Sequence, residues 1–139
     1  PEVTNSNLML RNYVKKLNLQ DDIFLLGPKD NISSYMDTID LKILMTKSES
    51  FPNVIAESMA CETPCISSDE GEARKIIGST GWIITENNPN ILSSKIIEGI
   101  VEWKNKLNWN KRKKLARERI IKFYSLEKMI LAYENFWKK

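Results

Sequence analysis

The chain has 139 residues, 42% of them hydrophobic, and a formal net charge of +3 at pH 7, which is enough apolar material for one domain with its own core. Its longest apolar runs are four or five residues, far short of the ~20 that cross a bilayer, and no charged-then-apolar leader opens it. The sequence therefore predicts neither a membrane-spanning nor a secreted protein.

Short apolar runs alternate with helical segments along most of the chain. This alternation predicts an α/β fold, a Rossmann-like parallel sheet flanked by helices. In chain order we expect a helix at residues 5–18, a buried strand at 23–26, a short helix at 32–37, a strand at 41–45, a helix at 52–61, a strand at 65–67, a short helix at 72–77 and a strand at 82–85. No convincing strand precedes the first helix, so we expect the sheet to lack its first strand.

The last third of the chain is predicted to be helical. Asn88-Pro89 is a helix start signal, and the apolar stripe after it is expected to pack on the sheet: Ile91, Leu92, Ile96, Ile97, Ile100 and Val101. A basic helical segment comes next at residues 111–123, and Ser125 is a suitable N-cap for a final helix. The apolar face of that helix comprises Leu126, Met129, Ile130, Tyr133, Phe136 and Trp137. We expect residues 1–139 to form a single domain.

Charge is distributed unevenly. Residues 1–100 hold 9 Lys or Arg against 14 Asp or Glu, whereas residues 101–139 hold 12 against 4, so the two regions face different partners or surfaces. The chain has two cysteines, Cys61 and Cys65, and no histidine, so a zinc site would lack ligands. We expect reduced thiols and a cytoplasmic protein.

Two glutamates, Glu49 and Glu57, flank the start of the helix expected at residues 52–61. In an open parallel sheet, ligands bind beyond the carboxyl ends of the strands, where the following helices present their N-termini. Backbone N–H groups near Phe51 to Val54 lack intrahelical partners and suit a diphosphate, and Pro52 gives up only a spare donor. Carboxylates repel phosphate but accept hydrogen bonds from hydroxyls. The pattern therefore predicts a sugar-nucleotide site, because hydroxyls lie on both sides of that diphosphate.

The stretch SESFPNVIAESMACETPCISSDEGE (residues 48–72) resembles the Glu-x7-Glu motif and its downstream flank in the retaining glycosyltransferases of family 4, which have the two-domain GT-B fold. DDIFLLGPKDNISSYMDTIDLKIL (21–44) and GWII (81–84) are similar to the strand, Leu-Gly turn, short helix and later strand of that family. The chain departs from the family where Ser50 and Glu62 replace frequent glycines and Lys75 replaces a frequent glutamate. These departures leave the donor open between UDP- and GDP-sugars.

The resemblance implies roles for individual residues. Glu49 would lie against the hydroxyls of the donor sugar as the catalytic position, and Glu57 would bind the nucleotide ribose. Backbone amides of the motif would face the diphosphate and sugar, and the loop Gly27-Pro28-Lys29 would border the nucleobase. The donor-binding residues expected on these grounds are Gly27, Pro28, Lys29, Ser50, Phe51, Pro52, Asn53, Val54 and Glu57.

The resemblance also implies the activity. The chain is expected to be the C-terminal, donor-binding portion of a larger enzyme that transfers a hexose, with retention, from a nucleotide-diphosphate sugar to a polysaccharide or lipid-linked acceptor. No cofactor or metal is expected, and the fragment should be inactive without its N-terminal acceptor domain. The alternatives are a sugar-nucleotide epimerase of the same fold and a non-catalytic adaptor with a vestigial pocket.

Two simpler interpretations of these residues stay open. Acidic residues near a helix N-terminus can act only through the helix dipole, at about 0.3–1 kcal/mol each. The basic segment Lys111–Lys122 is most often a solvated face; its alternative is peripheral contact with the inner face of an anionic cell membrane. Nucleic acid is not expected, because no basic strand interleaved with aromatics and no recognition-helix spacing is present.

Overall fold

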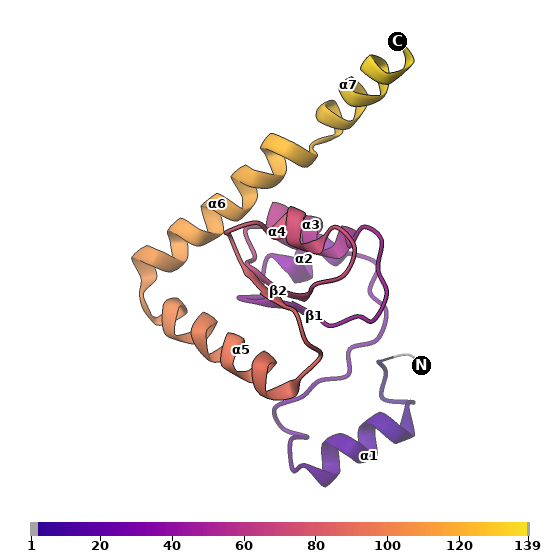
Figure 1. The fold of residues 1–139 in the computed structure, drawn as a ribbon. Helices are drawn as coiled ribbons and strands as arrows, with labels where there is room; N and C mark the ends of the chain where they lie inside the picture. Colours follow the sequence, from indigo (N-terminus) through magenta and orange to yellow (C-terminus); the bar gives the residue numbers. More distant parts are fainter. Residues whose placement is uncertain (1–2, 139) are drawn as a thin grey trace. The chain divides into compact units, whose positions relative to one another are not determined.

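A computed structural model describes residues 3–138 of the chain (Figure 1). The chain divides into two compact units, Pro1–Ile32 and Ser33–Lys139, and each is described by itself. The N-terminal unit contains α1 (Leu8–Lys16), and α2 (Ile32–Met36) begins at the boundary. The C-terminal unit contains β1 (Lys42–Leu44), α3 (Asn53–Ala60), β2 (Cys65–Ser68), α4 (Ala73–Ile77), β3 (Trp82–Ile84), α5 (Pro89–Lys104), α6 (Lys106–Tyr124) and α7 (Leu126–Trp137).

In the N-terminal unit, α1 has recognisable caps at both ends. Asn7 accepts a hydrogen bond from the Leu10 amide at its start. At its end Asn18 takes a positive φ of 55° and Leu19 N–H bonds back to the Val14 carbonyl, which is a Schellman motif. The helix expected at residues 5–18 is therefore confirmed with shorter bounds.

The buried strand expected at residues 23–26 is wrong. Within the described residues this segment makes a single antiparallel bridge, between Leu26 and Thr4, and it belongs to no ladder. Phe24 is 72% exposed. An apolar run becomes a buried strand only where another strand pairs with it, and residues 3–32 supply one bridge rather than a neighbouring strand.

The C-terminal unit has a three-stranded parallel sheet in the order β1-β2-β3. The register pairs Ile43 with Ile66 and Ser67 with Ile83. β2 lies in the middle and is buried at all four positions, as a central parallel strand covered on both faces must be. The expected α/β class is therefore confirmed. The elements from β1 to β3 lie within one residue of their predicted bounds, whereas α6 begins five residues before the predicted helical segment 111–123.

Helices cover both faces of this sheet (Figure 1). α3 and α4 pack on one face together with α6, around a core that comprises Ile55, Met59, Cys65, Ile76, Ile77, Ala116 and Ile120. α5 packs on the other face, where a Cβ at Gly99 would lie 3.2 Å from Leu41 and 3.6 Å from Trp82. The predicted apolar stripe of α5 is only partly covered, since Ile97 and Val101 are more than half exposed; the close approach is made through Gly99 instead.

The turn that ends α3 places Glu62 in a left-handed backbone conformation, which glutamate does not favour. Glu62 has φ = 59°; its amide bonds to the Met59 carbonyl, and the Thr63 amide bonds to the Ser58 carbonyl. These are the two bonds of a Schellman motif, whose left-handed position is usually glycine. Glycine is also the frequent residue at this position in the family that the sequence resembles.

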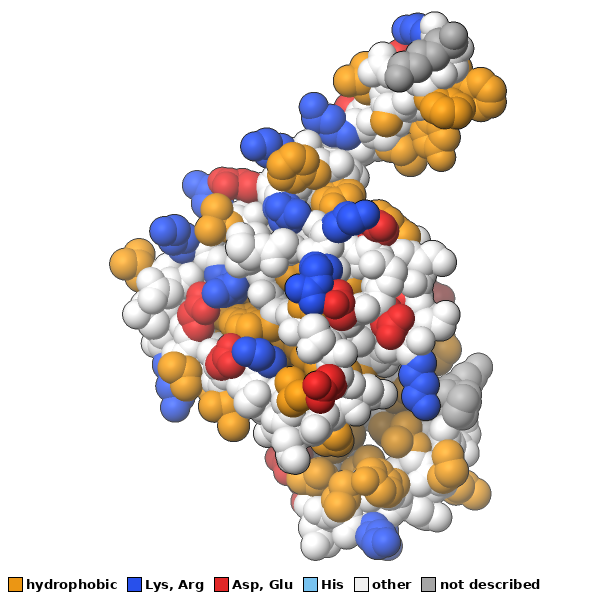
Figure 2. All heavy atoms as spheres, viewed as in Figure 1, with side chains coloured by type: hydrophobic (Ala, Val, Ile, Leu, Met, Phe, Trp, Pro, Cys, Tyr) orange, Lys and Arg blue, Asp and Glu red, His pale blue; other side chains and the backbone are white. Residues whose placement is uncertain are grey.

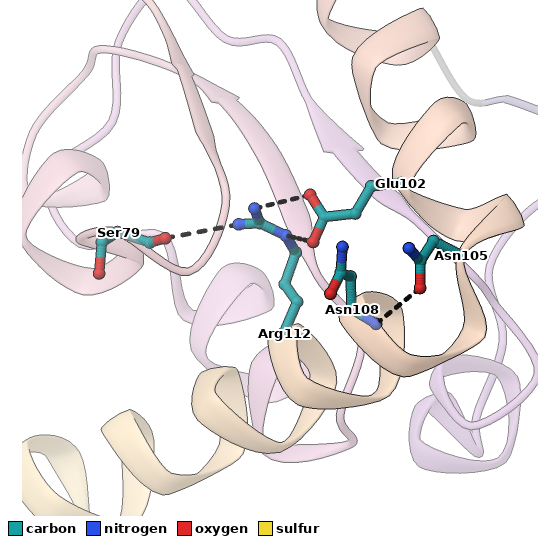
Figure 3. A network of polar contacts seen from close by, with 5 residues as sticks. All are labelled: Ser79, Glu102, Asn105, Asn108 and Arg112. Carbon is teal, nitrogen blue, oxygen red and sulfur yellow. Dashed lines mark hydrogen bonds and ion pairs between the residues drawn. The ribbon is translucent and has the colours of Figure 1, made fainter.

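A polar network ties α5 and α6 to the turn before β3 (Figure 3). The guanidinium of Arg112 donates two hydrogen bonds of 2.8 Å to the Glu102 carboxylate and one of 3.4 Å to the Ser79 carbonyl. It also lies 4.4 Å from the centre of the Trp82 ring. One charged side chain thus holds two helices and a turn together.

The last helix, α7, has Ser125 as its N-cap, as predicted, and the Ser125 hydroxyl accepts a hydrogen bond from the Lys128 amide. Its apolar side chains are all exposed, and Figure 2 shows them gathered along this helix. They are Leu126, Met129, Ile130, Leu131, Tyr133, Phe136 and Trp137.

Candidate functional site

The candidate site lies at the carboxyl ends of β1 and β2, where the loops into α3 and α4 meet. Two hydrogen bonds join the strands there: the Thr46 amide donates to the Ser68 hydroxyl at 3.1 Å, and that hydroxyl donates to the Thr46 carbonyl at 3.0 Å. Beyond them, the Asp69 amide bonds to the Ile84 carbonyl of β3 at 2.9 Å. The carboxyl ends of the three strands are therefore joined by hydrogen bonds between residues at or just after these ends.

The loop after β2 fixes the loop that carries Glu49. The Glu72 amide donates to the Ser50 carbonyl at 3.0 Å. Gly71 has φ = 53°, and a Cβ there would lie 2.3 Å from the carbonyl oxygens of both Glu49 and Ser50. Only glycine permits both the backbone angle and the close approach. The sequence signal for this contact was the glycine in DEGE, directly after a strand.

Only some of the unpaired backbone amides predicted at the N-terminus of α3 are present in the structure. Pro52 precedes the helix and provides no side-chain cap. The Asn53 amide donates to the Phe51 carbonyl at 2.9 Å, so it is not spare. Within residues 3–138, the amides of Phe51 and Val54 make no hydrogen bond. Two donors of the predicted four-residue stretch therefore face no protein acceptor.

The two motif glutamates differ in their environments. Glu49 is half-buried, and its carboxylate accepts a hydrogen bond of 3.1 Å from the Ser50 amide. One carboxylate oxygen is thus held in place while the group keeps further acceptor capacity. Glu57 is exposed, while Ile55, Ser58 and Met59 form the buried side of α3. Since Ile55 and Glu57 are two residues apart, Glu57 lies on the solvent side of the helix.

The predicted residues Gly27, Pro28 and Lys29 belong to the N-terminal unit. Gly27 has φ = 68°, and its amide donates to the Val3 carbonyl at 2.7 Å. A Cβ at this position would lie 3.0 Å from the Thr4 side chain. The turn therefore needs glycine on local grounds, and a role toward a nucleobase stays a prediction.

Sequence reasoning missed two further features beside the site. Arg74 makes two hydrogen bonds, of 2.9 and 2.5 Å, to the carboxylate of Asp69, and these bonds hold the pKa of Asp69 below its usual value. The Phe51 ring packs against the Tyr124 ring, with centroids 6.0 Å apart. Asp69 and Arg74 are five residues apart, so their ion pair could have been found from the sequence. Nothing in the local sequence connects Phe51 with Tyr124.

Two arginines of the basic segment make hydrogen bonds to backbone carbonyls of other helices. Arg117 bonds to the Ala60 carbonyl at the end of α3, and Arg119 bonds to the carbonyls of Ile76 and Lys75 in the last turn of α4. Positive charge at a helix C-terminus is stabilising, because it interacts favourably with the negative end of the helix dipole. Contact of Lys111–Lys122 with a membrane stays a prediction, and it would depend on the lysines rather than on these arginines.

Two features are absent from the part of the chain that the structure describes. No group of three or more His, Cys, Asp or Glu side chains in residues 3–138 is arranged to hold a metal ion. Within the same residues, no helix is both long and apolar enough to cross a membrane.

A parallel sheet covered by helices on both faces, with loops that meet beyond the carboxyl ends of its strands, defines an open α/β domain, a class in which ligands bind at that end of the sheet. The particular family follows from comparison with known proteins. A family model of the glycosyl transferases group 1 matches residues 4–117. The chain therefore belongs to this family of glycosyltransferases.

Individual relatives agree with this assignment. The chain is 29% identical over 126 residues to the N-acetyl-alpha-D-glucosaminyl L-malate synthase of Bacillus anthracis, a match to 89% of this chain and 32% of that protein. It is 38% identical over 93 residues to an uncharacterized glycosyltransferase of Methanocaldococcus jannaschii, covering 64% of this chain and 26% of the relative.

A solved structure supports the fold. Sucrose-phosphate synthase from Thermosynechococcus elongatus superposes with a TM-score of 0.82 at 22% sequence identity, over 93% of this chain and 33% of that one. The chain is thus of the GT-B type in its fold, and it spans about a third of the length of these relatives.

Proposed function

We propose that this chain is the C-terminal, donor-binding portion of a retaining glycosyltransferase that takes its sugar from a nucleotide diphosphate. The acceptor is a polysaccharide or a lipid-linked saccharide, and the donor domain needs no metal. The observation that carries the proposal is the arrangement around α3: free amides at its N-terminus, Glu49 on the loop before it and Glu57 on its exposed side.

The chemistry of these groups fits a sugar nucleotide. Amides of Phe51 and Val54 at the positive end of a helix dipole suit a diphosphate, and they would also stabilise the charge that develops on it as it leaves. Carboxylates at Glu49 and Glu57 accept hydrogen bonds from hydroxyls of the sugar and the ribose. The C1–O bond to the diphosphate would break with its electron pair going to the diphosphate oxygen. The oxygen of the acceptor hydroxyl would bond C1 on the same face, and its proton would pass to the departing diphosphate.

Titration of the 15N-labelled chain with UDP and GDP tests the proposal. We expect amide shifts at residues 50–54 with one of the two nucleotides, a weaker response to the matching monophosphate, and no dependence on EDTA. Replacing Glu57 with Gln should weaken nucleotide binding about tenfold, the value of one hydrogen bond to a charged group. Because Glu57 is exposed, the melting temperature should stay unchanged.

Glu118→Gln is the matched control, since Glu118 is an exposed glutamate on α6 whose carboxylate pairs with Lys114 of the same helix. It should leave the nucleotide affinity unchanged. The proposal is overturned if UDP, GDP and their sugars leave residues 50–57 unperturbed, or if Glu57→Gln and Glu118→Gln bind the nucleotide equally well.

A further inference from the structure

Phe51 occupies the position directly before Pro52 and α3, where the proposed diphosphate site begins. The residue is 40% exposed, so the core alone does not fix its side chain. The ring that lies against it is Tyr124, the last residue of α6, at a centroid separation of 6.0 Å and an interplanar angle of 59°. Separations of about 4.5–7 Å with tilted planes are typical of favourable aromatic pairs.

Tyr124 is itself held firmly. Its hydroxyl donates a hydrogen bond of 3.0 Å to the Lys75 carbonyl at the end of α4. The same carbonyl accepts a second hydrogen bond, of 2.5 Å, from Arg119. The ring of Tyr124 also packs against the core between α3, α4 and α6. Phe51 therefore rests on a side chain anchored by packing and by a hydrogen bond.

The loop of the proposed site is thus held from two sides. The backbone of Gly71 and Glu72 fixes the segment Glu49–Ser50, and Tyr124 fixes the next residue, Phe51. The second contact comes from a residue beyond position 117, where the match to the family ends. Without it, the segment around Phe51 would keep only the backbone contacts made by Gly71 and Glu72.

We infer that Tyr124 is a positioning residue for the nucleotide-diphosphate site: it holds Phe51 so that the amides of Phe51 and Val54 point at the same anion. The inference rests on the proposed function. The C-terminal end of α6 would thus position the binding loop in addition to packing against the core. A residue that acts only through core packing would change the stability of the unit and leave nucleotide affinity unchanged.

Nucleotide affinity of folded variants tests the inference. Tyr124→Leu removes the ring contact and should weaken binding of the nucleotide that the wild-type chain prefers about two- to tenfold, the range expected for one aromatic pair. Tyr124→Phe keeps the ring and should lie closer to wild type. In a Phe51→Leu background, Tyr124→Leu should have no further effect on affinity, because its partner is already gone.

Ile120→Val is the structural control. Ile120 is a buried core residue of the same helix, so this variant should lower the melting temperature without changing nucleotide affinity. If Tyr124→Leu behaves as Ile120→Val does, or if the effects of Tyr124→Leu and Phe51→Leu on affinity simply add, Tyr124 is no positioning residue while the proposed function stands. If the wild-type chain binds neither UDP nor GDP, the proposed function fails and this inference fails with it.

Discussion

The carboxylate of Glu102 on α5 and the guanidinium of Arg112 on α6 form a two-point ion pair, with both N···O distances at 2.8 Å (Figure 3). Their side chains are 23% and 21% exposed, so water solvates them only in part. The pair lies at the end of the sheet where β3 begins, and the proposed nucleotide site lies at the opposite end. Its role is to join elements of the fold.

Breaking this pair should destabilise the unit. Arg112→Met keeps most of the side-chain volume over Trp82 but leaves Glu102 without its charged partner, at a cost of about 1–3 kcal/mol. The double variant Arg112→Met/Glu102→Gln should recover part of the loss. Urea unfolding measures both. Lys114→Met is the control, because the 4.0 Å pair of Lys114 with Glu118 is largely exposed and should be worth less than about 0.5 kcal/mol.

Gly71→Ala should affect both stability and binding. The added Cβ would lie 2.3 Å from two backbone oxygens in a left-handed conformation, so we expect at least about 2 kcal/mol of destabilisation and a displaced Glu49 loop. Gly78→Ala shares the positive φ, but the nearest atoms to its Cβ would belong to the guanidinium of Arg119 and not to the backbone. It should cost less and leave nucleotide affinity unchanged; equal effects of the two variants on affinity would contradict the role of Gly71 in the loop.

Glu62→Gly should stabilise the protein. Glu62 occupies the left-handed position of the Schellman motif that ends α3, and glycine removes that strain at some cost in unfolded-state entropy, for a net gain of about 0.5–1 kcal/mol. Thermal unfolding measures the gain as a higher Tm. Asn18→Gly is the matched variant at the end of α1, and it should change stability less because asparagine tolerates this conformation. A lower Tm for Glu62→Gly would show that its side chain makes a contact worth more than the strain.

The two cysteines are free and should react at different rates. Burial raises the pKa of Cys65 to about 12, with the charge of Lys42 opposing the shift only in part. Cys61 is half-buried, and its pKa is raised by burial and then by Asp37. Iodoacetamide at pH 8, followed by mass spectrometry, should label Cys61 first and Cys65 only after unfolding. Equal labelling of the folded chain would contradict the burial of Cys65.

The same pKa shift predicts a loss of stability at high pH. The unfolded chain loses the Cys65 proton above its ordinary pKa of 9.0, whereas the folded chain keeps it up to about 12. Between these values the unfolded state binds fewer protons, so the free energy of unfolding falls as pH rises. Urea unfolding from pH 8 to 10.5 should show a smaller decline for Cys65→Ala than for wild type. Parallel declines would show that other groups account for the pH dependence.

The helix and strand pattern of residues 33–138 was predictable because each element carries its own periodicity and is bounded by residues that break it, such as Pro64 and Pro89. The motif glutamates were found in the same way, from their spacing around a helix start. The strand predicted at residues 23–26 was wrong. An apolar run indicates a preference for burial, but it does not indicate whether a neighbouring strand is present to pair with it.

By itself, the sequence determined the α/β class, the helix that follows β1 and the position of Glu49 and Glu57 on either side of its start. The tertiary structure alone decided that Gly71 closes against the Glu49 loop and that Tyr124 rests on Phe51. Local pattern specifies an element through interactions between near neighbours in the chain. Contacts between residues 51 and 124 depend on how whole helices pack, which no short stretch of sequence encodes.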